Sequence, residues 1–174
     1  MSKKILVGFI VFILIWITVF AQINFLNSIP LFGVAANIGI VIITGIGLLS
    51  DKVPGGLAGA AYGILYDLLF GKCLGIYFAI YTTLGIASGK LSKGFSKENK
   101  LSMVYMVALF TIIAELFTYI AFAVIYGYSF EIFSAVWIVI KETIYNMLLA
   151  ALLFRPLTFV SEIINKSKNS YYLL

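Results

Sequence analysis

The stretch ILVGFIVFILIWITVFAQINFL, residues 5–26, decides the fold of this chain. It contains no charged residue and meets the length of roughly 20 mainly apolar residues that an α-helix needs to cross a bilayer. A short basic start precedes it, and Val19, Phe20 and Ala21 form a small-residue pattern of the kind cleaved in signal peptides. Because the apolar run continues past Ala21, we expect it to be kept as a transmembrane helix.

Five more apolar runs follow, separated by proline, glycine and charged residues. The six predicted helices span about 5–26, 36–50, 54–70, 73–91, 101–126 and 133–155. These runs do not alternate between apolar and polar residues, as the strands of a transmembrane β-barrel would. We therefore predict an all-α integral membrane protein in which residues 1–174 form a single transmembrane domain. The second and third helices are short, which favours little tilt or partial shielding from lipid.

The composition excludes an ordinary soluble domain. Of 174 residues, 63% are hydrophobic and 11% are charged, and the mean hydropathy is +1.10. Soluble domains are roughly 45–50% apolar and about 25% charged, so much of this surface must be covered by the lipid bilayer. The net charge of +5 does not indicate nucleic acid as a partner, because the basic residues lie between apolar runs and form no basic face.

The residue types present also exclude much chemistry. The chain has no histidine and a single cysteine, Cys73. It therefore lacks the Ser-His-Asp and Cys-His pairs of nucleophilic enzymes, a histidine-ligated zinc site and an intramolecular disulfide. It also lacks a glycine-rich phosphate loop. We expect no catalytic site, no cofactor and no metal, and nothing argues for catalysis by carboxylates alone.

The positions of the basic residues orient the predicted helices. When the six spans are threaded through a membrane, one side receives ten basic residues and the other side receives only Lys72. The ten are Lys3, Lys4, Lys52, Lys90, Lys93, Lys97, Lys100, Arg155, Lys166 and Lys168. Since cytoplasmic loops carry an excess of lysine and arginine, we predict that both termini are cytoplasmic.

The third predicted helix carries a stripe of small residues. Gly55, Gly59 and Gly63 recur at intervals of four, and Asp67 continues the same face near the outer end. Such small faces allow the backbones of two helices to approach closely in membranes. We predict either a helix-packing face within the chain or a face for another protein. Because pure packing needs no acid, we further expect Asp67 to contact a partner.

Ionisable residues inside the predicted spans form a second group of candidates. Glu115 lies near the middle of the fifth helix, and Lys141 and Glu142 lie near the middle of the sixth. A charge at the centre of a membrane helix costs about 2.5–3.5 kcal/mol on insertion scales, so it needs a partner. We expect Glu115 to pair with Lys141 or with another polar group of the sixth helix. Tyr145 and Asn146 complete this predicted intramembrane polar network. The alternative is that these polar residues contact a ligand, an ion or a partner protein.

Short features follow one another along the chain in an order typical of one family. They are the basic start, Gln22, the uncharged loop 30–33, Asn37, the glycine-rich run into GILYD at 63–67, Gly71, Leu74 and Gly75, the basic loop ending at 96–99, Glu115 and Tyr119, Tyr145 and Asn146, and FRPL at 154–157. Over nearly its whole length, the chain resembles the MreD family of rod shape-determining membrane proteins. Ala36 departs from the pattern, since the family commonly has proline there.

This resemblance implies a non-enzymatic scaffold in the bacterial cytoplasmic (inner) membrane. Its expected partner is an MreC-like single-span membrane protein. MreB filaments, RodA and a class B penicillin-binding protein belong to the same assembly, which inserts peptidoglycan during cell elongation. The resemblance also implies a fold similar to the S components of energy-coupling-factor transporters, which are six-helix proteins of this size.

That similarity leaves one competing function open, a substrate-binding S component of a vitamin transporter. Such a subunit needs an alanine-rich first helix to meet its transporter partner. The first helix here has Ala21 as its one alanine and carries Phe9, Phe12 and Trp16. The sequence therefore favours the scaffold, and a membrane enzyme that uses carboxylates ranks below both.

Overall fold

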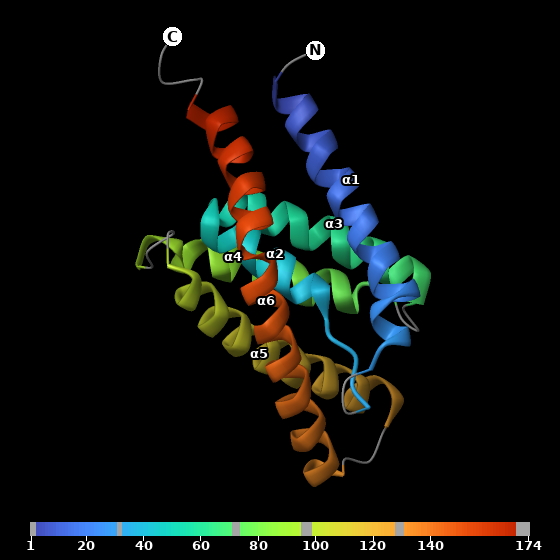
Figure 1. Ribbon diagram of the computed structural model, residues 1–174. Helices are drawn as coiled ribbons and strands as arrows, with labels where there is room; N and C mark the ends of the chain where they lie inside the picture. Colours follow the sequence, from blue (N-terminus) through green and yellow to red (C-terminus); the bar gives the residue numbers. More distant parts are fainter. Residues whose placement is uncertain (1–2, 31–32, 71–73, 95–98, 128–130, 170–174) are drawn as a thin grey trace.

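The computed structural model describes residues 3–30, 33–70, 74–94, 99–127 and 131–169. These residues form six α-helices and two short 3-10 turns, arranged as in Figure 1. The helices are α1 (Lys3–Asn24), α2 (Ile38–Leu49), α3 (Lys52–Phe70), α4 (Ile76–Leu91), α5 (Lys100–Tyr126) and α6 (Ile132–Asn169), with turns η1 (Leu26–Ser28) and η2 (Ser92–Gly94). The prediction of an all-α fold is confirmed.

The centre of the molecule is α2. Its sequence is apolar all round, and eleven of its twelve residues are buried, as expected for a helix without a polar face. It contacts each of the other five α-helices. At about 18 Å, it is shorter than the roughly 30 Å hydrocarbon core of a bilayer. Its burial shows why it can be short, because the neighbouring helices shield it from lipid.

The helices α3 and α4 lie side by side and run across the direction of α1 and α6 (Figure 1). Glycines on both helices make this contact close. A methyl group at Gly55 would overlap the carbonyl oxygen of Gly85, and one at Gly89 would overlap the backbone of Lys52. Because no Cβ fits at these positions, the two backbones touch directly, as in small-residue packing between membrane helices.

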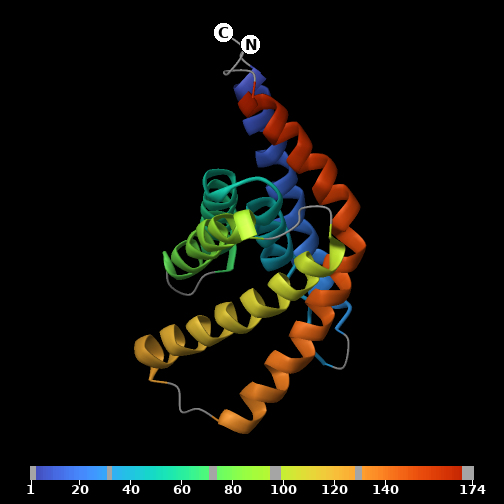
Figure 2. The ribbon, with the colours of Figure 1, turned by 90° about the vertical axis from the view of Figure 1, so that its left-hand side faces the viewer.

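The last helix, α6, is longer than predicted. The sequence placed its end at residue 155, before Pro156, but the helix continues to Asn169 with Pro156 inside it. A proline within a helix removes one backbone hydrogen bond and bends the axis, and Figure 2 shows α6 changing direction along its length. The segment beyond Pro156 stays helical because it packs on α2. Leu157 reaches Gly45, and Asn165 Nδ2 donates to the Leu49 carbonyl at 3.2 Å.

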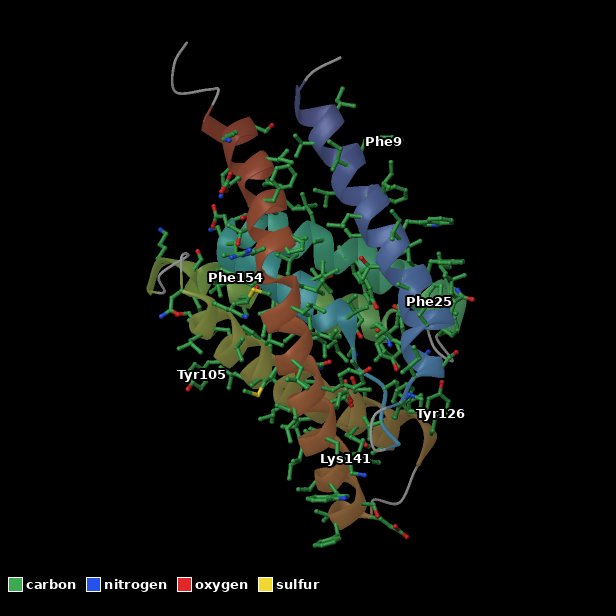
Figure 3. The ribbon with its side chains drawn as sticks, viewed as in Figure 1. Phe9, Phe25, Tyr105, Tyr126, Lys141 and Phe154 are labelled. Atoms are coloured by element: carbon green, nitrogen blue, oxygen red, sulfur yellow. The ribbon has the colours of Figure 1, made fainter. Side chains whose placement is uncertain are left out.

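Four elements are long and apolar enough to cross a membrane, namely α1, α3, α5 and α6. Large side chains on them point outward, including Phe9 and Phe25 at the first helix and Tyr105 on α5 (Figure 3). The start of α1 and the end of α6 lie at the same end of the molecule in both Figure 1 and Figure 2. This arrangement fits an even number of crossings, while six crossings remain a prediction.

Candidate functional sites: a polar core and an apolar groove

Asp67 joins the end of α3 to the start of α4. Its carboxylate accepts hydrogen bonds from the backbone N–H groups of Gly75 at 3.0 Å, Tyr77 at 3.1 Å and Phe78 at 2.9 Å. The first N–H groups of a helix have no partner within the helix, and a negative charge at that end is favourable. Gly75 adopts a φ of 102° just before α4, which glycine does without strain.

The expectation that Asp67 contacts a partner protein is therefore corrected. Its side chain is only 3% exposed, and its oxygens are bound to α4 of the same chain. The acid is needed inside the chain because a helix start buried in the bundle requires an acceptor for its N–H groups. Sequence reasoning placed Asp67 on the correct helix face but did not connect it to a helix start eight residues later.

The glycine stripe of α3 likewise faces inward, against α4. A methyl group at Gly59 would overlap the carbonyl oxygen of Tyr81, and one at Gly63 would overlap the backbone of Phe78. Of the two predicted alternatives, the structure shows packing within the chain. The sequence contained a further signal, since Gly85 and Gly89 repeat the same spacing of four on α4.

A network of side-chain amides holds the start of α2. Gln22 of α1 donates from Nε2 to the Ala36 carbonyl at 2.8 Å, and its Oε1 accepts from the Ile38 N–H at 2.9 Å. Asn37 caps α2 by accepting from the Ile40 N–H at 3.3 Å. The loop before α2 is thus tied to α1 through one buried glutamine.

Asn146 of α6 connects the start of α2 to α5. Its Oδ1 accepts from the Asn37 N–H at 2.7 Å, and its Nδ2 donates to Thr111 Oγ1 on α5 at 3.1 Å. From α4, the Tyr81 hydroxyl accepts from Asn37 Nδ2 at 3.0 Å. Asn146 has no exposed surface, and buried polar groups of this kind fix a unique packing when they are satisfied.

The two glutamates of the predicted network lie against each other. The carboxyl groups of Glu115 on α5 and Glu142 on α6 are in hydrogen-bonding contact, and Glu142 also contacts the Asn146 side chain. The pair therefore joins α5 to α6 inside the helix bundle.

Lys141 does not form the ion pair with Glu115 that the sequence offered as one possibility. Its ammonium group lies over the ring of Trp137, 5.7 Å from the centroid. The physical reason is helix geometry. Consecutive residues point about 100° apart, so α6 directs Glu142 toward α5 and turns Lys141 to another face. Tyr145 is not part of the Glu115–Glu142 cluster either, and its hydroxyl donates to the Ile29 carbonyl at 3.3 Å.

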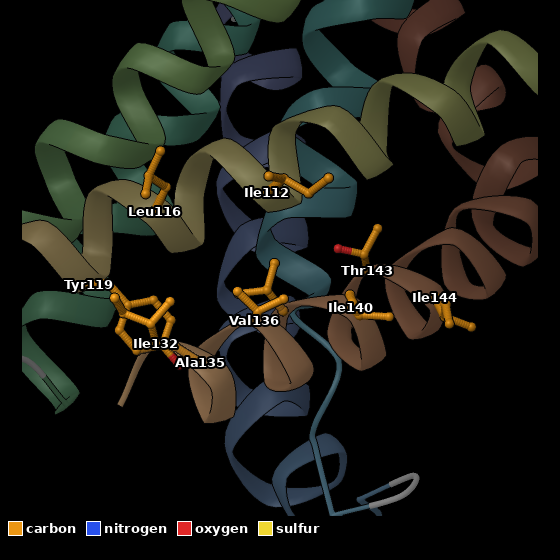
Figure 4. Close-up of a pocket in the computed structure, with 10 residues that line it drawn as sticks. Ile112, Leu116, Tyr119, Ile132, Ala135, Val136, Ile140, Thr143 and Ile144 are labelled. Carbon is orange, nitrogen blue, oxygen red and sulfur yellow. The ribbon is translucent and has the colours of Figure 1, made fainter. Parts of the chain in front are cut away.

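An apolar groove lies between α5 and α6, beyond the glutamate pair (Figure 4). Its volume is about 520 Å³. Its lining is Ile112, Leu116 and Tyr119 of α5 with Ile132, Ala135, Val136, Val139, Ile140, Thr143 and Ile144 of α6. The two helices diverge here, as Figure 2 shows. Sequence reasoning missed this groove because its residues read only as apolar membrane-helix positions.

Comparison with known proteins settles the resemblance. The family model described as rod shape-determining protein MreD matches residues 2–161. No curated protein and no solved structure matches the chain, and the similarity to S components of energy-coupling-factor transporters remains an expectation. The alternative function as a vitamin-binding subunit gains no support from these comparisons. With a match over most of its length and helices suited to crossing a membrane several times, the chain belongs to the MreD family of rod shape-determining proteins.

Proposed function

We propose that this chain is a non-catalytic scaffold of the bacterial cytoplasmic membrane that binds an MreC-like single-span partner. In this role it supports rod shape and peptidoglycan insertion, together with MreB, RodA and a class B penicillin-binding protein. The proposed topology has six spans with both termini in the cytoplasm. The family match supports the role in shape determination, and the groove between α5 and α6 is the observation that carries the partner site.

The groove suits the transmembrane helix of a partner. Along α6 it extends from Ile132 to Ile144, which is about 18 Å of helix. Its walls are apolar except for the hydroxyl groups of Tyr119 and Thr143. Apolar side chains of a single membrane helix can fill such a groove, and van der Waals packing drives helix association in lipid.

The polar core beside the groove supports a scaffolding role. The hydrogen bonds from Asn146 to Asn37 and Thr111 join α6 to α2 and α5. The contact between Glu115 and Glu142 also joins α5 to α6, next to the groove. A rigid base of this kind would keep the groove open without a partner, which reduces the conformational cost of binding.

Filling the groove tests this proposal. Ala135→Phe places an aromatic ring in the groove, whereas Ala79→Phe places the same ring on an exposed face of α4. At matched membrane levels, we expect Ala135→Phe to reduce co-purification of a tagged MreC-like partner by about tenfold, and Ala79→Phe to leave it unchanged. Equal yields from the two variants would contradict the assignment of the partner to this groove.

A further inference from the structure

Among the described residues of α6 that line the groove between α5 and α6, Thr143 alone is polar. Ala135, Val139 and Thr143 follow one another at intervals of four, which places them on one face of the helix. In Figure 4 the side chain of Thr143 stands on α6 and faces α5 across the groove. A helix that fills the groove would therefore pass over the Thr143 side chain.

The Thr143 hydroxyl has no hydrogen-bond partner among the described residues, although its oxygen is buried. A threonine inside a helix can donate to the backbone carbonyl four residues earlier. Four threonines of this chain do so, at donor–acceptor distances of 2.6–2.8 Å, namely Thr18, Thr83, Thr111 and Thr158. Thr44 on α2 and Thr82 on α4 also lack a partner among the described residues, but neither lines the groove. Thr143 thus brings an unused hydrogen-bonding group to the proposed partner site.

An unused hydroxyl at this place favours a polar contact with the partner helix. No water in the hydrocarbon core of a bilayer can replace a missing hydrogen bond, and a buried polar group without a partner costs free energy. Threonine has two common rotamers in a helix, so rotation about χ1 can turn the hydroxyl toward the groove without moving α6. Hydrogen bonds between polar side chains join helices in membranes. Thr143 therefore gives the α6 wall of the groove one polar point.

We propose that the partner's transmembrane helix presents a hydrogen-bonding side chain (serine, threonine, asparagine or glutamine) to the Thr143 hydroxyl, and that this bond sets the register of the partner in the groove. The inference rests on the proposed function, because it takes the groove between α5 and α6 as the partner site. It adds the chemistry that separates the correct partner from other apolar helices, since an apolar residue opposite Thr143 leaves the hydroxyl unsatisfied. Thr143 is then a specificity-determining residue of the site, while the apolar lining supplies the packing.

The test measures the affinity of the full chain for an MreC-like partner by fluorescence resonance energy transfer in lipid vesicles. Thr143→Val removes the hydroxyl and nearly keeps the shape of the side chain. We expect it to raise the Kd about threefold, which is what an average hydrogen bond between membrane helices contributes. Thr143→Ser keeps the hydroxyl and should bind more tightly than Thr143→Val. The matched control is Thr83→Val, which removes an exposed hydroxyl that already donates to Ala79, and its Kd should equal that of the parent chain.

A double-mutant cycle identifies the partner residue that faces Thr143. Each serine, threonine, asparagine or glutamine of the partner's transmembrane helix is changed to alanine in turn, and its Kd is measured with the parent chain and with Thr143→Val. One of these changes should lose its effect in the Thr143→Val background, as expected for two side chains that bond each other. An unchanged Kd for Thr143→Val, equal losses in Thr143→Val and Thr143→Ser, or additive effects throughout the cycle would each overturn the inference.

Crosslinking separates this inference from the proposed function. Disulfides from Ile140→Cys, in a Cys73→Ser background, report whether the partner helix occupies the groove, whichever residue faces Thr143. If these disulfides form while Thr143→Val binds as the parent chain does, the groove is the partner site and only the hydrogen bond is wrong. If they do not form, the proposed function fails and the hydrogen bond fails with it.

Discussion

The carboxylate of Asp67 accepts the backbone N–H of Phe78 at 2.9 Å, and this bond caps α4 from the end of α3. Two further N–H groups share the same carboxylate, while the glycines of α3 pack on α4 below it. The two helices therefore form a hairpin that is closed at one end by a buried acid. The facing sides of α3 and α4 belong to the interior of the protein, whereas Leu57 and Leu68 on α3 are exposed.

Removing this cap should destabilise the folded chain. Replacing a helix-capping acid by alanine costs about 0.5–2 kcal/mol, and unsatisfied buried donors cost about 1–3 kcal/mol. We expect Asp67→Ala to lower the free energy of unfolding by about 2 kcal/mol. The stability of Asp67→Asn should lie between those of the parent chain and Asp67→Ala. Glu162→Ala, which removes an exposed carboxylate that pairs with the exposed Lys166, is the control, because exposed ion pairs contribute little. Reversible unfolding in detergent measures the difference, and equal stability of the two alanine variants would contradict the capping role.

Two glycines in membrane helices should respond in opposite directions to the same substitution. A methyl group at Gly59 would overlap the Tyr81 carbonyl, and backbone atoms of a neighbouring helix move only at a high cost. Gly59→Ala should lower the free energy of unfolding by about 1–3 kcal/mol. Gly8→Ala meets nothing within 4 Å and should raise it by up to about 1 kcal/mol through helix propensity. Similar effects at both positions would show that α3 and α4 are not in direct backbone contact.

Substitutions can distinguish the contact between Glu115 and Glu142 from an ion pair between Glu115 and Lys141. Glu142→Leu leaves the Glu115 carboxyl without its partner and should cost about 1–3 kcal/mol. The double variant Glu115→Leu with Glu142→Leu should be less destabilised than the sum of the two single variants, because the partners are removed together. Lys141→Met combined with Glu115→Leu should show additive effects, because the two side chains face different sides. A strong non-additive effect between Glu115 and Lys141 in unfolding experiments would restore the ion pair as the correct arrangement.

The proposed topology predicts where reporter enzymes are active. A reporter fused after Leu174 should be cytoplasmic, and one inserted at Ser28 should be external, because ten basic residues fall on the predicted cytoplasmic side. Alkaline phosphatase and green fluorescent protein fusions read the two sides independently. An external reporter at Leu174 would mean that one of the six helices does not cross the membrane.

Local patterns predicted the six helices well, whereas tertiary contacts decided what the sequence could not. The apolar runs of α1 and α5 ended within two residues of their predicted bounds, since length and hydropathy are local properties. Pro156 predicted an end to α6, but packing of Leu157 on Gly45 outweighs the lost hydrogen bond. Tertiary context routinely overrides such local preferences.

In the candidate site too, local patterns predicted some features and tertiary packing decided the others. Spacing placed Gly55, Gly59 and Gly63 on one face, and depth placed Glu115 level with the middle of the predicted sixth helix, 133–155. Which of two adjacent residues, Lys141 or Glu142, faces α5 depends on the rotation of α6 about its axis, and that rotation is set by packing. The groove between α5 and α6 is a property of shape between helices, so no pattern along one helix could reveal it.

Cysteine crosslinking within the membrane tests whether the partner helix lies between α5 and α6. In a Cys73→Ser background, Ile140→Cys lies in the groove and Trp16→Cys lies on an exposed face of α1. Each is paired with single cysteines along the transmembrane helix of a tagged MreC-like partner. We expect disulfides from Ile140→Cys that recur every three to four partner residues, as a helix face requires, and none from Trp16→Cys. Crosslinks from Trp16→Cys alone would contradict it.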